Sequence, residues 1–208
     1  MNHVLGITAL EFLWRMGVLS DPAAGALPAE EETKWLARGA GGDEQAWQEL
    51  FEKWKKPLLA FFYRSIGSLA AAEDLTLEVF IRLHRAAPTY QPRAPFAGFV
   101  FHIARNLLRN EVRRQRRKPA DLLPPEAFDY VSAPDDGEER RRAAELEEML
   151  QLALAQLPEA QRTLVLLVYQ QNLDHTTAAE MLGITGNALR VQLHRARQKL
   201  KELMQSQP

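Results

Sequence analysis

Apolar residues recur at spacings of three and four along most of this 208-residue chain, and this periodicity limits the folds that it can adopt. The spacing is typical of amphipathic helices, whereas no stretch of useful length alternates between polar and apolar residues as a half-buried strand does. A proline-rich, acidic stretch interrupts the helical pattern beyond the middle of the chain. We therefore predict an all-α protein with two small helical bundles, joined by a flexible acidic linker.

The same pattern divides the chain into four segments. Residues 1–30 are an N-terminal extension, fairly apolar and ending in a turn-rich spacer, and three interpretations of it remain open: a short packed helix, a loose tail, or a start site further downstream at Met16. The first bundle is predicted for residues 31–118 and the acidic linker for residues 119–143. The second bundle is predicted for residues 144–208.

Local signals place helices within the two bundles. The first bundle should contain an amphipathic helix from Asp43 to about Tyr63, which Pro57 is expected to kink or divide. Ser68 is placed to cap the next helix. A proline-containing loop around Tyr90 then precedes a third helix, whose C-terminal end is rich in arginine. Four further helical stretches are predicted after the linker.

Charge is distributed unevenly along the chain, although the net charge is only −1. Residues 1–52 hold nine acidic and three basic side chains, and residues 119–148 hold ten acidic and three basic ones. By contrast, residues 105–118 hold seven basic and one acidic side chain, and residues 190–201 hold five basic and no acidic ones. Two compact positive patches, one in each predicted bundle, indicate a polyanionic partner such as nucleic acid.

The residues that many catalytic and metal sites need are missing or scattered. The chain has no cysteine, which excludes disulfides, thiolate metal sites and a cysteine nucleophile. Its five histidines lack metal-ligand spacing, and it has no glycine-rich phosphate loop and no G-x-S-x-G motif. No run of 18 apolar residues is long enough to span a membrane. We therefore expect no enzymatic activity, no metal or other cofactor, and no membrane insertion.

The segment that begins at Asp174 has the pattern of a helix-turn-helix. Asp174 is placed to cap a short helix, Gly183 allows a tight turn, and Thr185 can cap a second helix with an inward apolar stripe. The outward side of the second helix would present side chains that suit base edges and phosphates in a major groove. An ordinary helical hairpin with a solvated basic face is the competing interpretation. The candidate DNA-binding residues are Asn187, Arg190, Gln192, His194, Arg195 and Arg197.

Two stretches of the chain resemble the extracytoplasmic-function (ECF) class of bacterial sigma-70-type sigma factors. The first reads AEDLTLEVFIRLHRA, then a loop, then FAGFVFHIARNLLRNEVRRQRRK, and is similar to region 2 with its E-D-L-x-x-E-V-F and I-A-R-N motifs. The second reads LPEAQRTLVLLVYQQNLDHTTAAEMLGITGNALRVQLHRARQKLKEL, and is similar to region 4 with its L-P-x-x-x-R, A-x-x-L-G-I and L-H-R-A-R motifs. They cover roughly residues 35–118 and 144–204, and their order and spacing are highly specific in combination.

The resemblance implies a dissociable subunit of RNA polymerase that acts in the cytoplasm. In such a subunit, region 2 would bind the β′ clamp helices and help to melt the promoter −10 element, while region 4 would bind the β flap and read the −35 element. A dedicated anti-sigma factor is also expected as a partner. The alternative is a stand-alone helix-turn-helix regulator that binds DNA without polymerase, and a DNA-independent helical adaptor is a third interpretation.

Carried over to this chain, the family pattern assigns residues to three surfaces. The core-polymerase surface would comprise Glu73, Asp74, Glu78 and Arg82. The −10 surface would comprise Tyr90, Arg93, Arg105, Asn106, Arg109, Arg113 and Arg114. The tyrosine of this set would stack on a base flipped out of the −10 element. The −35 surface would comprise the six helix-turn-helix residues named above.

Some positions depart from the family's usual residues. Leu77 stands where the family often has glutamine, which alters the expected β′-binding surface. Phe99 replaces a common tryptophan before I-A-R-N, and Ala188, Leu189 and Gln192 replace the usual residues of the second helix. We expect these changes to leave the fold intact and to affect the preferred −35 sequence.

Overall fold

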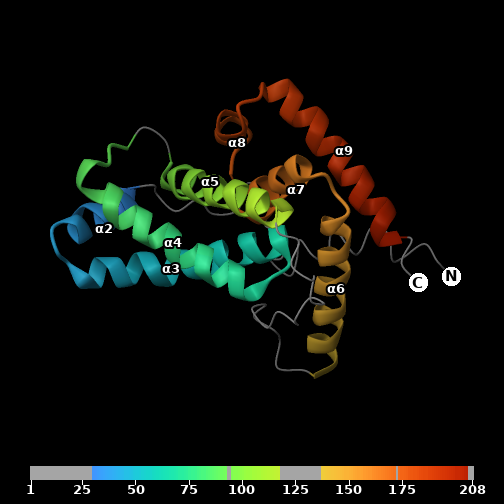
Figure 1. Ribbon diagram of the computed structural model, residues 1–208, viewed down its shortest axis with the longest axis horizontal. Helices are drawn as coiled ribbons and strands as arrows, with labels where there is room; N and C mark the ends of the chain where they lie inside the picture. Colours follow the sequence, from blue (N-terminus) through green and yellow to red (C-terminus); the bar gives the residue numbers. More distant parts are fainter. Residues whose placement is uncertain (1–29, 93–94, 118–136, 172, 206–208) are drawn as a thin grey trace. The chain divides into compact units, whose positions relative to one another are not determined.

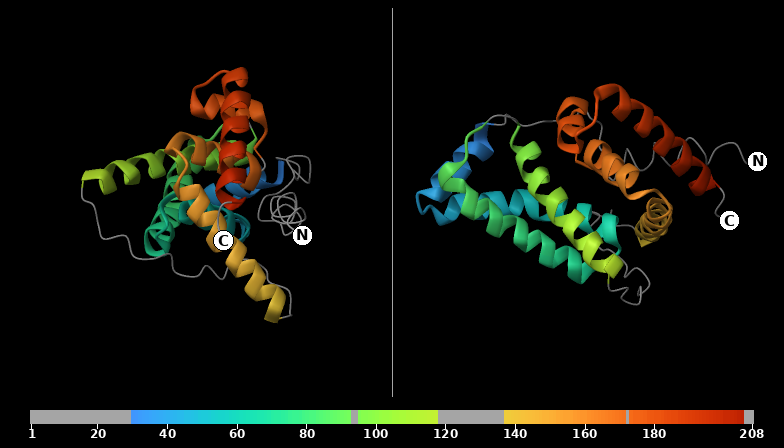
Figure 2. Two further views of the ribbon diagram at one scale, coloured as in Figure 1. Left: turned by 90° about the vertical axis from the view of Figure 1, so that its right-hand side faces the viewer. Right: turned by 45° about the horizontal axis from the view of Figure 1, so that its top comes forward.

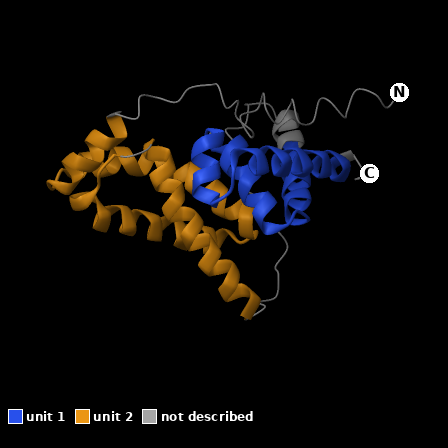
Figure 3. Ribbon diagram, turned by 90° about the horizontal axis from the view of Figure 1, so that it is seen from above, with its two compact units in different colours: residues 1–24, 123–208 blue, residues 25–122 orange. Residues whose placement is uncertain are grey.

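The computed structural model describes residues 30–92, 95–117, 137–171 and 173–205 of the chain. The chain divides into two compact units, one of residues 25–122 and one of residues 1–24 with 123–208, shown in separate colours in Figure 3. Both units are helical bundles, and no strand occurs in the described ranges. The predicted all-α class with two bundles is thereby confirmed. Residues 1–29 of the predicted extension and residues 119–136 of the predicted linker lie outside the described residues.

The unit of residues 25–122 is the first predicted bundle. Its helices are α2 (Glu30–Ala40), α3 (Glu44–Ile66), α4 (Leu69–Ala86), the short 3₁₀ helix η1 (Ala87–Thr89) and α5 (Phe96–Arg117). Helices α3 and α4 pack side by side, and α5 crosses them, as Figure 2 shows on the right. Helix α2 packs against α3 and against η1, which follows the end of α4 (Figure 1).

Capping residues determine where α3 and α4 begin. The Asp43 carboxylate accepts the backbone N–H of Ala46 at 3.1 Å, and the Ser68 hydroxyl accepts that of Ala71 at 3.4 Å, as predicted for Ser68. Helix α3 continues through Pro57, so the expected division of this helix does not occur. Buried side chains on both sides of the proline hold the helix together at this point.

Aromatic side chains form much of the core of the first bundle. Trp54 and Phe61 of α3 lie 5.8 Å and 5.4 Å from the ring of Phe101 in α5, measured between ring centroids, and Phe96 also contacts Trp54. Burying each such ring stabilises the fold by about 1.5–3 kcal/mol. The apolar spacing that predicted α3 is confirmed by the burial of Leu50, Trp54, Leu58, Phe61 and Phe62, whereas Trp47 and Phe51 are only partly buried.

Helix α2 is an element that the sequence pattern did not predict, because only Trp35 and Leu36 of its first seven residues are apolar. Leu36 is fully buried, and the buried Glu32 carboxylate pairs with Lys53 of α3 at 2.7 Å. The Lys53 ammonium also lies 5.6 Å from the centroid of the Trp35 ring. Contacts with α3 therefore stabilise a short helix that contains few apolar residues.

We predict that Gly39→Val destabilises the first bundle by about 1–3 kcal/mol. A Cβ atom at Gly39 would lie 2.8 Å from the Trp47 indole, whose Nε1–H donates to the Gly39 carbonyl at 3.0 Å. Urea unfolding monitored by circular dichroism measures the effect. The matched control is Gly186→Ala, because a Cβ at Gly186 meets no atom within 4 Å. Equal stabilities of the two variants would contradict the proposed clash.

The unit that contains residues 123–208 is the second predicted bundle. Its helices are α6 (Gly137–Ala155), α7 (Glu159–Val165), the π-helical turn η2 (Leu166–Gln170), α8 (His175–Leu182) and α9 (Gly186–Gln205). Helix α9 packs against α6, α7 and α8. Helix α6 begins inside the predicted linker, because its first turns are rich in glutamate and arginine, which favour helix without apolar periodicity. None of the described helices has the length and hydrophobicity that a membrane span needs.

The arginine of the L-P-x-x-x-R motif has a structural role in this bundle. The guanidinium of Arg162 donates to the carbonyl oxygens of Ala155 and Leu157, at 2.7 Å and 3.3 Å. Burial lowers the pKa of Arg162, and the negative charge of Glu159 opposes that effect. Arg162 thus satisfies backbone carbonyls at and after the C-terminus of α6, which otherwise lack partners within the helix.

Candidate nucleic-acid interface

Helices α8 and α9 form the predicted helix-turn-helix, and the three predicted turn and cap residues have the predicted roles. The Asp174 carboxylate accepts the backbone N–H groups of Thr176 at 3.0 Å and of Thr177 at 2.9 Å, and the Thr177 hydroxyl at 2.6 Å. Gly183 ends α8 in the left-handed region with a φ of 66°. The Thr185 hydroxyl accepts the N–H of Ala188 at 3.2 Å and caps α9.

Hydrogen bonding keeps the Asp174 cap ionised. Partial burial raises the pKa of the Asp174 carboxyl, but the hydrogen bonds from the Thr177 side chain and from the Thr177 and Thr176 backbones outweigh it, so the pKa lies below its ordinary value. The ionised carboxylate therefore stabilises the folded state at neutral pH, and this contribution is lost as the pH falls through the lowered pKa.

We predict that Asp174→Ala destabilises the second bundle by about 1 kcal/mol at neutral pH. Because the protonated carboxyl of the wild-type chain loses this cap as well, the difference between the two chains should shrink in acid. Denaturant unfolding at neutral and acidic pH measures both effects. Asp174→Asn is the matched control, since asparagine also caps helices but does not titrate. A difference that grows in acid would contradict this role of the carboxylate.

Helix α9 separates an apolar face from a polar one. Its buried face consists of Leu189, Leu193, Ala196 and Leu200. Five of the six predicted −35 residues are exposed: Asn187, Arg190, His194 and Arg195 on the opposite side, and Arg197 at its margin. Gln192 is half-buried on the flank, and the Arg197 guanidinium lies 5.7 Å from the centroid of the Tyr169 ring. The structure thus brings four of the predicted side chains together and leaves two at the margin of the face.

Helix α5 presents a polar stripe on the side away from its buried residues. The predicted residues Arg105, Asn106, Arg109 and Arg113 follow each other along this side at helical spacing. Arg109 and Arg113 are exposed, whereas Arg105 and Asn106 are half-buried. Burial lowers the pKa of Arg105, and the nearby positive charge of Arg109 lowers it further. Such a row of close positive charges favours an anion such as a phosphate backbone.

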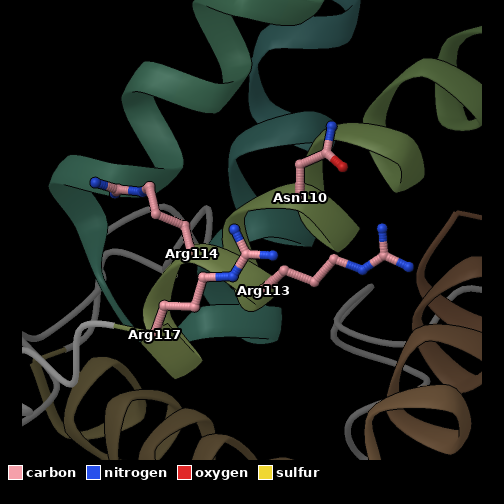
Figure 4. A pocket seen from close by; sticks show the side chains of 4 residues that line it. All are labelled: Asn110, Arg113, Arg114 and Arg117. Atoms are coloured by element: carbon pink, nitrogen blue, oxygen red, sulfur yellow. The ribbon is translucent and has the colours of Figure 1, made fainter.

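Near its C-terminus α5 borders a hollow of about 390 Å³ lined by Asn110, Arg113, Arg114 and Arg117 (Figure 4). Arg113 and Arg114 extend to opposite sides of the helix, and Arg117 lies between them. Asn110 and Arg117 were not among the predicted site residues. Their spacing of three and four residues from Arg113 and Arg114 is the sequence signal that places them on the same face.

Arg114 differs from the other predicted arginines because it has a partner within its own helix. Its Nε and Nη2 atoms each lie 2.7 Å from an oxygen of the Glu111 carboxylate. The hydrogen bond from Arg114 lowers the pKa of the Glu111 carboxyl against the effect of burial, and Gln115 adds to it at 3.0 Å. The Glu111 carboxylate therefore neutralises part of the charge that Arg114 could offer to DNA.

Tyr90 lies directly after η1 and packs on two aromatic residues of α5. The centroid of its ring lies 4.5 Å from that of Phe99 and 5.9 Å from that of Phe96. Burial raises the pKa of the Tyr90 phenol. Phe99, at the position of the family's tryptophan, thus supports Tyr90 from one side. Arg93, the remaining predicted residue of the −10 surface, lies outside the described residues.

The predicted core-polymerase residues of α4 surround an apolar strip. Glu73 and Asp74 are exposed, and Arg82 forms an ion pair with Glu78 at 2.8 Å. In the described part of the chain, no three histidine, aspartate or glutamate side chains gather so that they could hold a metal ion.

The centre of this face of α4 is apolar. Leu77 and Ile81 are 55% and 45% exposed, which is unusual for large apolar side chains of the described residues. They border a groove of about 590 Å³ between α3 and α4, whose other lining residues include Trp47 and Phe51 of α3. The predicted core-polymerase residues of α4 therefore flank an apolar centre, of which only Leu77 was expected to affect this surface.

Comparison with known proteins relates these surfaces to one family. Residues 50–118 match the family model described as Sigma-70 region 2, and residues 147–200 match the model described as Sigma-70, region 4. The chain is 34% identical over 181 residues to the ECF RNA polymerase sigma factor SigE of Mycolicibacterium smegmatis, covering 85% of this chain and 70% of that protein.

Two solved structures share the fold. The structure of CnrH in complex with the cytosolic domain of CnrY matches 86% of this chain and 100% of that chain, with a TM-score of 0.63 and 22% identity. The sigma factor RpoE in complex with the anti-sigma factor NepR from Bartonella quintana matches 77% of this chain and 98% of that chain, with a TM-score of 0.60 and 19% identity. At these identities the similarity establishes the fold.

Proposed function

Because this chain belongs to the ECF family of RNA polymerase sigma factors, we propose that it binds core polymerase and directs it to specific promoters. The observation that carries this proposal is the presence of both family regions, in the family's order, each on its own helical bundle. The protein would act inside the cell, where RNA polymerase works. Its task would be selective binding, without bond chemistry of its own.

Promoter recognition would begin with α9 in the major groove of the −35 element. The exposed side chains Asn187, Arg190, His194 and Arg195 offer hydrogen-bond donors and acceptors to base edges and positive charge to phosphates. The buried Leu189 and Leu193 hold the helix on the bundle at the same time. Because the cap at Asp174 and the turn at Gly183 fix α8 against α9, the helix would be presented rigidly to the duplex.

Melting of the −10 element would depend on Tyr90 and α5. A base that leaves the stack can stack on an aromatic ring, which contributes about 1–3 kcal/mol per base. The Tyr90 ring packs on Phe99 on one side, and such a base would stack on its other side. Arg109 and Arg113 on α5 would hold the phosphate backbone next to it. Binding single-stranded bases better than paired ones would thus offset part of the cost of melting.

Core polymerase would bind the α4 face through the β′ clamp helices, and the second bundle would bind the β flap. Charges on the rim of the α4 face, such as Asp74 and the Glu78–Arg82 pair, would orient the partner, while the apolar centre at Leu77 and Ile81 would supply most of the affinity. We also propose an anti-sigma factor as a regulating partner, since the similar RpoE structure contains one.

Run-off transcription tests this function. Bacterial core polymerase is incubated with and without the protein on a pool of promoter fragments from the same genome. We expect specific transcripts only when the protein is present, and their start sites then identify the −10 and −35 sequences. If no transcript depends on the protein while the protein alone binds specific duplexes, the stand-alone regulator becomes the better account.

A further inference from the structure

Val191 is an apolar residue on the polar face of α9 that the proposed function does not yet use. It is 43% exposed, although valine is one of the weaker helix formers and its side chain gains nothing from solvent. Single exposed apolar residues are common on protein surfaces, so exposure by itself does not indicate a function. The position of Val191 within the helix does indicate a function.

Helical geometry places Val191 at the middle of the outward face. It follows Asn187 by four residues and precedes Arg195 by four, and residues at this spacing are neighbours on a helix surface. His194 follows Val191 by three residues, and Arg190 directly precedes Val191 in the sequence. The exposed polar residues of α9 therefore surround Val191. A helix that enters a major groove with this face would bring Val191 against the base edges.

The chemistry of valine limits what it can contact there. Its side chain neither donates nor accepts hydrogen bonds, so a polar base edge beneath it would lose water without gaining a partner. The 5-methyl group of thymine is the apolar group on the major-groove edge of the base pairs. The arginines next to Val191 can bond guanine edges or phosphates, and so leave the apolar contact to the valine.

We propose that Val191 contacts the methyl group of one thymine in the −35 element and selects thymine at that position. This inference rests on the proposed function, because it requires α9 to read promoter DNA. It assigns a specificity-determining role to a residue outside the set that we predicted from the sequence.

The test removes the methyl group from the DNA and the valine from the protein. On a promoter that the holoenzyme transcribes, each thymine of the −35 element is replaced in turn by deoxyuridine, which pairs identically but lacks the methyl group. With the wild-type chain, we expect one such replacement to weaken promoter binding about fourfold, as for one buried methyl-sized group. With Val191→Ser the same replacement should have no further effect, because the contact is already absent.

Val191→Thr is the matched control, since threonine keeps one of the two methyl groups and should retain part of the uridine effect. Circular dichroism checks that both variants fold. The inference is overturned if every thymine-to-uridine replacement has the same effect on the wild-type chain and on Val191→Ser. Failure of the proposed function is distinguishable, because the wild-type holoenzyme would then transcribe no promoter at all.

Discussion

A chain in which Leu77 and Ile81 are both replaced by alanine is expected to bind core RNA polymerase about 100-fold more weakly than the wild-type chain. The two side chains are 55% and 45% exposed at the centre of a groove, and a partner helix that covers them would bury both. Apolar residues at the centre of an interface, with charges at the rim, typically account for most of the affinity. Titration of labelled protein with core polymerase measures this loss.

The chain offers a matched control for this prediction. Leu152 on α6 is also an exposed large apolar residue, at 40%, but it does not border the groove. Because α6 belongs to the bundle proposed to bind the β flap, this control is read with the isolated β′ clamp helices, for which Leu152→Ala should change the affinity less than about twofold. Equal losses for Leu152→Ala and for the double variant would contradict the assignment. Alanine keeps the helix propensity of α4, so the double variant is expected to fold.

Replacement of both Arg109 and Arg113 by alanine is the second change with a large expected effect. The affinity of the holoenzyme for promoter DNA should fall about 10- to 100-fold, because two exposed charges on the α5 stripe no longer reach phosphates. The slope of the logarithm of affinity against the logarithm of salt concentration should decrease by about 2, one for each lost phosphate contact. Promoter binding at several salt concentrations measures both quantities.

Lys56 serves as the control for charge alone. It is exposed on α3, so Lys56→Ala removes a positive charge from the same bundle without removing a proposed DNA contact. Its salt slope should equal that of the wild-type chain. A lower affinity of the double variant with an unchanged salt slope would show that Arg109 and Arg113 act by some means other than phosphate binding.

Much of the fold could be predicted because its signals are local. The caps at Ser68, Asp174 and Thr185 and the turn at Gly183 depend on residue types within a few positions, and each has the predicted role in the structure. Helix α2 could not be predicted in this way. Its 11 residues include few apolar side chains, and its stability depends on contacts with distant residues, such as the pair of Glu32 with Lys53.

The residues of the candidate site likewise fall into those that local sequence signals predicted and those that they did not. The exposed arginines of α5 and α9 were identified from helical spacing and charge, since an amphipathic helix must turn such residues outward. The i,i+3 spacing of Glu111 and Arg114 allows their ion pair without specifying the rotamers that form it, and the half-burial of Gln192 depends on packing. The groove at Ile81 was missed because an apolar residue on an amphipathic helix is ordinarily assigned to the core.

Promoter binding by the free chain, compared with binding in the presence of core polymerase, tests the central claim most directly. A labelled duplex that contains a promoter transcribed with this protein is titrated with the chain alone and with the chain bound to core polymerase. A sigma factor should show specific binding only with core polymerase, because α5 and α9 then contact the −10 and −35 elements together. Equally tight and specific binding by the free chain would contradict the account and would identify a stand-alone regulator.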